Sequence, residues 1–252
     1  MKNNADIIWL ESTDSTNSEA ARRISDIDKL SVISAKTQTK GRGQRGNIWK
    51  SEGGMNLTFS IVVKPGTGGM PEIAARDQFI ICELITLALK DSLASYGIFA
   101  KIKWPNDIYA GDKKICGILI ENTLKGDLVG ASIIGVGLNV NQTEFPEDLP
   151  NPTSMKIEGG REYDVEKVLE YLVGRFCKYL DMAADDGGRK KLRELYLADL
   201  YRKDEWHNYD LPLEGRRFKG MIRGISGIGN LLVEDEAGRR FEFGFKEIGY
   251  IL

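Results

Sequence analysis

The chain has a single histidine, His207, among its 252 residues. Nucleophile systems of the Ser-His-Asp or Cys-His type need a histidine base, and metal sites built from several histidines need more than one. His207 stands between Trp206 and Asn208 late in the chain, where we expect a surface or packing role. The scarcity of histidine therefore directs attention to chemistry that needs no imidazole.

Cysteine is also scarce, and long apolar runs are missing. The three cysteines are isolated, odd in number and set among apolar neighbours: Cys82, Cys116 and Cys177. This pattern is typical of reduced core residues, not of a disulfide framework or a zinc site. The first residues lack the apolar segment of a signal peptide, and no run approaches the ~20 apolar residues of a membrane span. We therefore expect a cytoplasmic protein without a membrane partner.

An excess of positive charge is missing as well, because 35 Lys and Arg residues face 37 Asp and Glu residues. Polyanion-binding proteins are usually basic, so DNA is not an expected partner. Residues 29–51 nevertheless contain no acidic residue, and within them three glycines alternate with four cations: Gly41, Gly43 and Gly46 with Lys36, Lys40, Arg42 and Arg45. Glycines let backbone N–H groups approach an anion. The segment predicts a site for a phosphate or a carboxylate; a solvated basic loop is the alternative.

Hydrophobic periodicity predicts an α+β fold in which helices pack on a mixed sheet. The expected strands are 9–12, 30–35, 56–63, 99–104, 115–121 and 128–140, and the expected helices begin at 16 or span 71–96, 164–182 and 188–201. After residue 206, short strands alternate with glycine turns (217–225, 230–234 and 240–245), which indicates a small β-barrel. We place a larger domain at 1–204 and the small one at 205–252.

Three further segments carry polar residues typical of a binding site. Asp14-Ser-Thr-Asn17 stands at a predicted helix start, where helix capping is the simpler interpretation. Lys101–Asp107 and Asp112–Gly117 flank a turn, and Lys113 and Lys114 at a strand entrance can point one inward and one to water. A solvated charged hairpin is the alternative there. Gly135-Val-Gly-Leu-Asn-Val-Asn141 ends an apolar strand and, by itself, predicts a turn.

Together and in this order, the four segments resemble the catalytic part of biotin protein ligases (biotin–[acetyl-CoA-carboxylase] ligases). That family shows an Asp-Ser-Thr-Asn helix start, a Gly-Arg-Gly-Arg-Arg-Gly-x-x-Trp loop, a Lys-Trp-Pro-Asn-Asp segment leading to Lys-x-x-Gly-Ile-Leu, and a Gly-x-Gly-x-Asn strand. The resemblance covers nearly the whole chain. It implies a class II synthetase-like catalytic domain with a C-terminal SH3-like barrel. It also implies that no DNA-binding repressor domain is present, because the Ser-Thr-Asn motif begins at Ser15.

The resemblance assigns roles residue by residue. Catalytic roles fall to Lys114 and Arg42, on the biotin carboxylate and the α-phosphate, and to Asp107, in the ligation step. Biotin binding is implied for Ser15, Thr16, Asn17, Gln38, Gly41, Arg42, Lys114 and Gly117. ATP or adenylate binding is implied for Lys40, Arg42, Arg45, Trp49, Asn106, Lys114 and Asn139. Mg²⁺ is expected on the ATP phosphates, without a dedicated protein site.

The implied reaction has two steps. ATP activates biotin to biotinyl-5′-AMP with release of pyrophosphate, and the biotin then passes to a lysine of a biotin carboxyl carrier protein or domain. Gln44 and Asn47 stand where some relatives have arginine, so we expect retention of the adenylate to rest more on Lys40, Arg42 and Arg45, or to be looser. The rivals are a lipoate ligase of the same fold and a biotin-responsive binding protein. A monomer and a homodimer both stay open.

Overall fold

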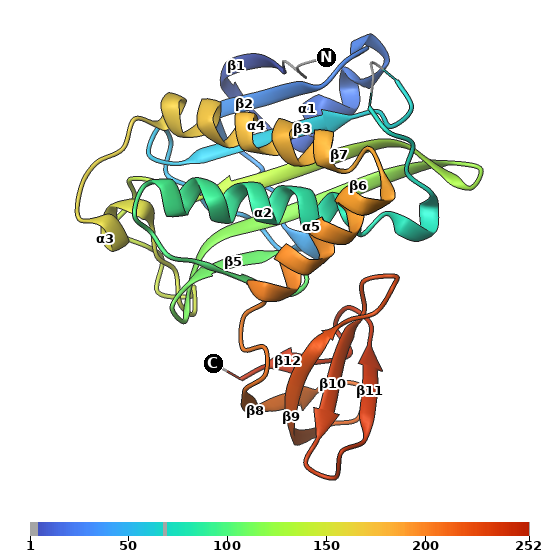
Figure 1. The fold of residues 1–252 in the computed structure, drawn as a ribbon. Coiled ribbons are helices and arrows are strands. Elements are labelled where there is room, and N and C mark those ends of the chain that lie inside the picture. Colours follow the sequence, from blue (N-terminus) through green and yellow to red (C-terminus); the bar gives the residue numbers. More distant parts are fainter. Residues whose placement is uncertain (1–4, 68–69, 252) are drawn as a thin grey trace.

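The computed structural model describes residues 5–67 and 70–251. Its larger part contains a seven-stranded sheet with the order β1-β2-β3-β7-β6-β5-β4 (Figure 1). The strands are β1 (Asp6–Thr13), β2 (Ser31–Gln38), β3 (Leu57–Val63), β4 (Lys101–Lys103), β5 (Asp107–Ala110), β6 (Lys113–Lys125) and β7 (Leu128–Leu138). β1 and β2 are parallel, and the other neighbours are antiparallel. The predicted α+β class with a mixed sheet is confirmed.

The helices α2, α4 and α5 lie together over one face of this sheet, whereas α1 packs against β2, β3 and β7 (Figure 1). The α-helices are α1 (Thr16–Arg22), α2 (Ile80–Ser95), α3 (Met155–Gly159), α4 (Val165–Met182) and α5 (Asp186–Ala198). α4 begins where Asp164 caps it by accepting the N–H groups of Glu166 and Lys167. The helix predicted from residue 164 is therefore found at its expected start.

The alternation of side chains along β3 separates two faces of different chemistry. Leu57, Phe59 and Ile61 belong to the main core under α2, while Ser60 reaches Thr16 of α1. Along β7 the same alternation leaves two glycines on the α1 side: Gly135, which pairs with Ser60 of β3, and Gly137, which pairs with Thr58. One face of the sheet is therefore filled by apolar side chains, and the other is left open for a polar cavity.

The helix predicted at 71–96 is shorter than expected, because α2 begins only at Ile80. The preceding residues pair with the start of β7: Ile73 O accepts the Val129 N–H at 2.9 Å, and the Ala75 N–H donates to Asp127 O at 2.8 Å. These long-range bonds satisfy backbone groups that a longer helix would otherwise use. The prediction was wrong because periodicity does not detect such pairing.

The C-terminal part is a separate antiparallel sheet with the order β11-β10-β9-β8-β12, below the larger sheet in Figure 1. Its strands are β8 (Trp206–Leu211), β9 (Arg216–Ile225), β10 (Leu231–Asp235), β11 (Arg240–Phe243) and β12 (Gly249–Tyr250). The predicted short strands are found. In the described residues, β11 and β12 stay unpaired edges, so hydrogen bonds do not close the sheet into a full barrel. The domain division at 204/205 stays a prediction.

Specific contacts attach the C-terminal sheet to the larger part. The buried Trp104 indole donates to Gly229 O at 2.8 Å, and Arg193 of α5 donates to Ser226 O at 2.9 Å. Arg193 also pairs with Glu83 of α2, whose side chain is only 2% exposed. Burial raises the pKa of Glu83, although Arg193 opposes the shift. The loop between β9 and β10 is thus held against the floor of the larger part.

The predicted state of the cysteines is confirmed, because all three are free and buried. Burial raises the pKa of the Cys177 thiol to about 11. His207 is half-buried on β8 beside Glu205, outside the cavity described below. None of the helices in residues 5–67 and 70–251 combines the length and apolarity of a membrane span.

Candidate functional site

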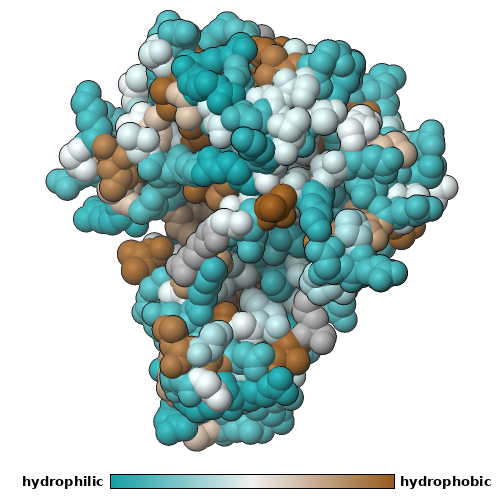
Figure 2. All heavy atoms as spheres, turned by 180° about the vertical axis from the view of Figure 1, so that it is seen from behind, coloured by the Kyte–Doolittle hydropathy of each residue, from teal (hydrophilic) through white to brown (hydrophobic). Residues whose placement is uncertain are grey.

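A cavity of about 940 Å³ opens on the α1 side of the large sheet and reaches the C-terminal sheet. Seen from behind, the surface is hollowed between the large upper part and the small lower part (Figure 2). Sequence segments that are far apart meet in its wall. The predicted site residues found there are Ser15, Thr16, Asn17, Gln38, Arg42, Trp49, Asn106, Asp107, Lys114, Gly117 and Asn139.

The floor of the cavity is a pair of glycines on adjacent strands, Gly117 of β6 and Gly137 of β7. The Trp49 indole lies on this pair: a Cβ added to Gly137 would be 2.2 Å from Trp49 Cε2, and one added to Gly117 would be 2.9 Å from Trp49 Cζ3. The buried Trp49 Nε1–H has no acceptor in the described part of the chain. Buried donors are normally paired, so a ligand with an acceptor here would satisfy it.

The glycine-rich loop is pinned by its own backbone. The Gly43 N–H donates to Asn47 O at 2.7 Å, and the Trp49 N–H donates to Gly41 O at 3.1 Å. Gly46, at a φ of +85°, ends the short turn at 44–46 in a conformation that favours glycine. Two predicted loop residues, Lys40 and Gly41, do not line the cavity, and the side chain of Arg45 lies outside the described residues.

The Asp14–Asn17 segment does not cap α1 with a side chain, so the capping interpretation is wrong. Instead the Thr16 N–H and hydroxyl donate to Gln38 Oε1 at 2.7 and 3.2 Å. The Ser60 hydroxyl bonds with Thr16 Oγ1 and Asn17 Oδ1 at 2.8 and 2.6 Å. In a helix cap, these side chains would bond the free N–H groups of the first turn of α1. Here their hydrogen-bond partners are Gln38 of β2 and Ser60 of β3. The result is a small polar network at one end of the cavity.

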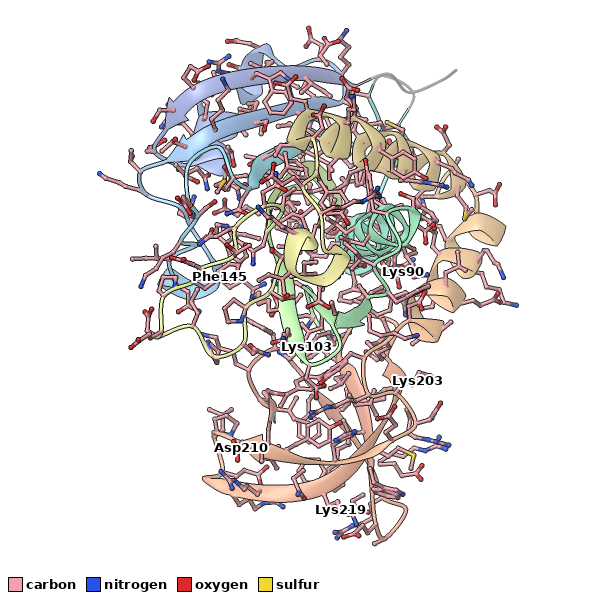
Figure 3. The ribbon with its side chains drawn as sticks, turned by 90° about the vertical axis from the view of Figure 1, so that its left-hand side faces the viewer. Lys90, Lys103, Phe145, Lys203, Asp210 and Lys219 are labelled. Atoms are coloured by element: carbon pink, nitrogen blue, oxygen red, sulfur yellow. The ribbon has the colours of Figure 1, made fainter. Side chains whose placement is uncertain are left out.

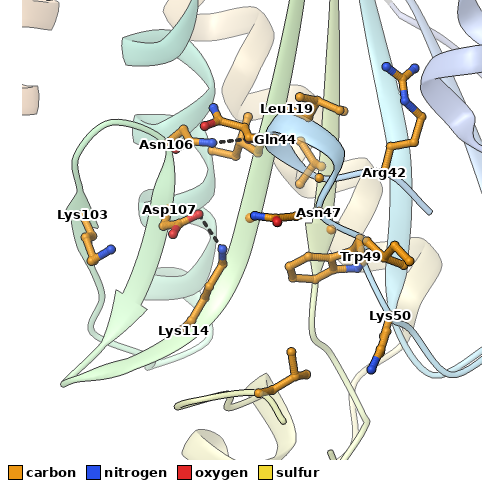
Figure 4. Close-up of a pocket in the computed structure, with 18 of the residues that line it drawn as sticks. Arg42, Gln44, Asn47, Trp49, Lys50, Lys103, Asn106, Asp107, Lys114 and Leu119 are labelled. Atoms are coloured by element: carbon orange, nitrogen blue, oxygen red, sulfur yellow. Dashed lines mark hydrogen bonds and ion pairs between the residues drawn. The ribbon is translucent and has the colours of Figure 1, made fainter. Parts of the chain in front are cut away.

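Arg42 is held at this same end by Glu121 of β6. Its guanidinium contacts both carboxylate oxygens, at 2.6 and 3.3 Å, and Glu121 also accepts from Asn17 Nδ2 at 2.7 Å. In Figure 4, Arg42 points away from Lys114. The two cations predicted to share the phosphate chemistry thus line one cavity but are not brought together.

Lys114 pairs with Asp107 at 2.7 Å and lies 5.8 Å from the centre of the Trp49 ring (Figure 4). Lys113 is exposed, so the expected division between the two lysines is confirmed. A register shift on β6, where Ile108 pairs with Cys116 but Tyr109 pairs with Lys114, adds one residue to the strand. Such a bulge redirects side chains next to functional sites. It places Lys114 beside Gly117, although three residues apart in a regular strand face opposite sides.

Asn106 and Asn139 are buried at the cavity wall and are engaged with backbone groups. Asn106 Nδ2 donates to Ile118 O, and its main-chain O accepts the Ile118 N–H at 3.1 Å. Asn139 Nδ2 donates to Thr153 O at 2.8 Å. Both amides fix the strands that carry the site, and the predicted role at the nucleotide stays a prediction.

Residue-by-residue prediction missed the cations and rings on the C-terminal side of the cavity. Lys103 of β4 lies 5.0 Å from the Tyr109 ring centre and 4.7 Å from that of Tyr250 on β12. Burial lowers the pKa of Lys103, and burial raises the pKa of Tyr109 to about 12. Lys103 is part of the Lys-Trp-Pro-Asn-Asp segment, so a signal for it was present. Tyr250 had none, because only the tertiary fold brings β12 to this wall.

Comparison with known proteins identifies solved structures of the same architecture. The structure of the biotin protein ligase from Aquifex aeolicus in complex with biotin and ATP superimposes with a TM-score of 0.78, at 26% identity over 97% of both chains. The mixed sheet, the glycine-floored cavity and the C-terminal sheet therefore define a protein ligase of this fold.

Sequence relatives agree. The biotin–[acetyl-CoA-carboxylase] ligase of Paracoccus denitrificans is 31% identical over 242 residues, covering 92% of this chain and 95% of the relative. The bifunctional ligase/repressor BirA of Bacillus subtilis is 30% identical over 91% of this chain and 68% of its own. Residues 9–139 match the Biotin/lipoate A/B protein ligase family, and the chain belongs to that family.

Proposed function

We propose that this protein is an ATP-dependent biotin protein ligase that forms biotinyl-5′-AMP and transfers biotin to a lysine of a biotin carboxyl carrier protein or domain. The observation that carries the proposal is the cavity itself. Its glycine floor lets the flat Trp49 ring lie close against the sheet, the N–H of that indole has no partner in the described residues, and Arg42 and Lys114 supply positive charge at the two ends of the cavity. The Aquifex aeolicus structure in complex with biotin and ATP, and the Paracoccus denitrificans relative, a biotin ligase, support the choice of substrates.

The first step needs no base. A biotin carboxylate oxygen attacks the α-phosphorus of ATP, the bond from that phosphorus to the bridging oxygen breaks, and pyrophosphate leaves with the electron pair. The protein has to hold two anions together and stabilise the charge that develops. We assign the carboxylate and the α-phosphate to Lys114, and the phosphate to Arg42 once a ligand has drawn it from Glu121. The polar network of Ser15, Thr16, Asn17 and Gln38 would bind the ureido ring.

The second step needs an uncharged acceptor lysine. Its nitrogen attacks the carbonyl carbon of the mixed anhydride, the carbon–oxygen bond to phosphate breaks, and AMP leaves. Asp107 would orient the amine and take up its proton. In the structure this carboxylate is paired with Lys114, and a phosphate bound to Lys114 would weaken that ion pair and make Asp107 available to the amine. The family resemblance, not a contact with a carrier, supports this assignment.

Mg²⁺ would be held by phosphate oxygens and water, where it would offset the charge of the triphosphate. Within the described residues, no three His, Cys, Asp or Glu side chains are grouped as a metal site would require. The carboxylates of the described cavity wall are Asp107 and Asp148, and each is paired with a lysine, so the donor set fits an ion carried in by ATP rather than a resident one.

The test is biotin-dependent exchange of labelled pyrophosphate into ATP, with lipoate and octanoate as alternative acids. We expect exchange with biotin alone. Exchange with lipoate instead would move the function to the lipoate branch of the family. No exchange with any acid, from folded protein with Mg²⁺, would contradict the proposal and favour a biotin-binding protein.

A further inference from the structure

Lys103 is a cation of the cavity wall that the reaction described above does not use. It lies on β4 where the large sheet meets the C-terminal sheet (Figure 3), opposite Asp107 in the pairing of β4 with β5. Its ammonium faces two aromatic rings, Tyr109 from the large sheet and Tyr250 from the C-terminal sheet. The side chain is half-buried and lines the same cavity as Lys114.

The charge state of the wall sets Lys103 apart. Three other cations are each paired with a carboxylate: Arg42–Glu121, Lys50–Asp148 and Lys114–Asp107, at 2.6, 2.7 and 2.7 Å. Lys103 forms no such ion pair with any residue in 5–67 or 70–251, and the exposed Lys246 is the remaining described lysine of the wall. The cluster of Lys103, Asp107 and Lys114 therefore carries an excess of one positive charge.

A half-buried cation without a counter-ion is costly, and its environment indicates what would offset the cost. The two ring faces attract an ammonium but do not neutralise it. Burial lowers the pKa of Lys103; Asp107 opposes this shift and Lys114 adds to it, so the carboxylate that Asp107 shares with Lys114 does not stabilise the charge of Lys103 fully. An anionic ligand in the cavity would supply the missing partner through a charge-assisted hydrogen bond.

We propose that Lys103 binds the terminal phosphates of ATP and the pyrophosphate that leaves from them. This inference rests on the proposed function. If Lys114 holds the α-phosphate, Lys103 is the cation on the other side of Asp107 in the same cavity wall, and it forms no ion pair with a described residue that a further phosphate would have to displace. In the adenylation step, electron density moves to the bridging oxygen of the leaving group, where the charge of Lys103 would stabilise it. The rings of Tyr109 and Tyr250 keep the ammonium in place.

The test compares Lys103→Gln with Lys101→Gln and Lys103→Arg. Lys101 is a matched control on the same strand, because its ammonium pairs with Asp199 at 3.0 Å and it does not line the cavity. Binding of ATP, pyrophosphate and AMP is measured by titration calorimetry, and transfer is measured separately from supplied biotinyl-5′-AMP. Lys103→Arg keeps the charge at the wall.

We expect Lys103→Gln to weaken ATP and pyrophosphate binding by about 10- to 100-fold, the loss of one contact to a charged group, and to leave AMP binding and transfer within about threefold. Lys103→Arg should recover most of the loss, and Lys101→Gln should match the wild type. Equal losses for ATP and AMP, or unchanged ATP binding, would overturn the inference. Failure of the proposed function looks different, because wild type and Lys101→Gln would then also lack biotin-dependent exchange.

Discussion

Replacing Glu121 by glutamine removes the charge that holds Arg42 at the end of the cavity. The side chains of Arg42 and Glu121 are 46% and 37% exposed, so solvent screens their attraction. Ion pairs of this exposure contribute about 0.2–1 kcal/mol. A triphosphate carries more negative charge than one carboxylate, so it can compete with Glu121 for Arg42. The pair is therefore strong enough to position Arg42 and weak enough to be exchanged.

From these magnitudes, Glu121→Gln should strengthen binding of the adenylate by up to about fivefold, since Arg42 no longer has to leave a carboxylate. Arg42→Gln should weaken it by about 10- to 100-fold. Glutamine still offers an oxygen to Asn17, so the network that includes this contact should survive. The assay is the dissociation rate of biotinyl-5′-AMP from the protein, read together with its affinity.

Glu11→Gln is the matched control. It breaks the ion pair of Glu11 with Lys36, which is 2.7 Å long and exposed, and neither residue lines the cavity. It should leave the adenylate bound as tightly as in the wild type. If Glu121→Gln weakened binding as much as Arg42→Gln, Glu121 would itself be part of the ligand site, and the exchange of partners inferred here would be refuted.

Three further substitutions test other parts of the site and its support. Lys114→Ala should abolish adenylate formation in pyrophosphate exchange while the circular dichroism spectrum is unchanged; near-normal exchange would remove Lys114 from its role. Gly137→Ala should lower adenylate formation by about 100-fold, because its methyl group displaces the Trp49 indole, and urea denaturation should show a loss of about 1–3 kcal/mol in unfolding free energy from the same overpacking. Arg193→Met should cost about 3 kcal/mol of unfolding free energy by leaving Glu83 buried without its partner. Burial already raises the pKa of Glu83, so its carboxyl group binds a proton more tightly in the folded state than in the unfolded state. The loss of unfolding free energy caused by Arg193→Met, measured in urea titrations, should therefore be larger at about pH 7.5, where Glu83 is charged, than at about pH 5. Equal losses at the two pH values would contradict this.

The sequence was sufficient for the order of most helices and strands and for many residues of the cavity wall, although β5, α3, β8, β12 and the C-terminal side of the wall were not predicted. Four separated motifs predicted one site, and the fold does bring residues from α1, the glycine loop, β5, β6 and β7 into one wall. The physical reason is that each motif ends or begins a strand of the same sheet. Polar residues at strand ends that are neighbours in the sheet have to meet, even when the chain between them is long.

The contacts among these residues were not predictable, because they depend on partners outside the motifs. Nothing in the sequence around Arg42 indicates that Glu121, far along the chain, accepts its guanidinium. In the same way, Tyr250 reaches Lys103 only because the loop carrying Gly229 attaches the C-terminal sheet to Trp104. A sequence motif indicates which side chains belong to a site. The ion pairs that hold these side chains in the absence of ligand depend on tertiary packing, which the motif does not show.

The spacing of Lys114 and Gly117 shows how a motif and its geometry can be separated. In a regular strand this spacing would put the lysine and the glycine on opposite faces of the sheet, and only one of them could face the cavity. The bulge opposite Ile108 and Tyr109 reverses the alternation, so that a Cβ on Gly117 would lie 3.2 Å from Lys114 Cε. The Lys-x-x-Gly pattern therefore makes sense only together with this bulge. Because the extra residue inserts without any glycine or proline of its own, periodicity predicts a plain strand there, and only the paired register of β5 and β6 reveals why the lysine enters the cavity.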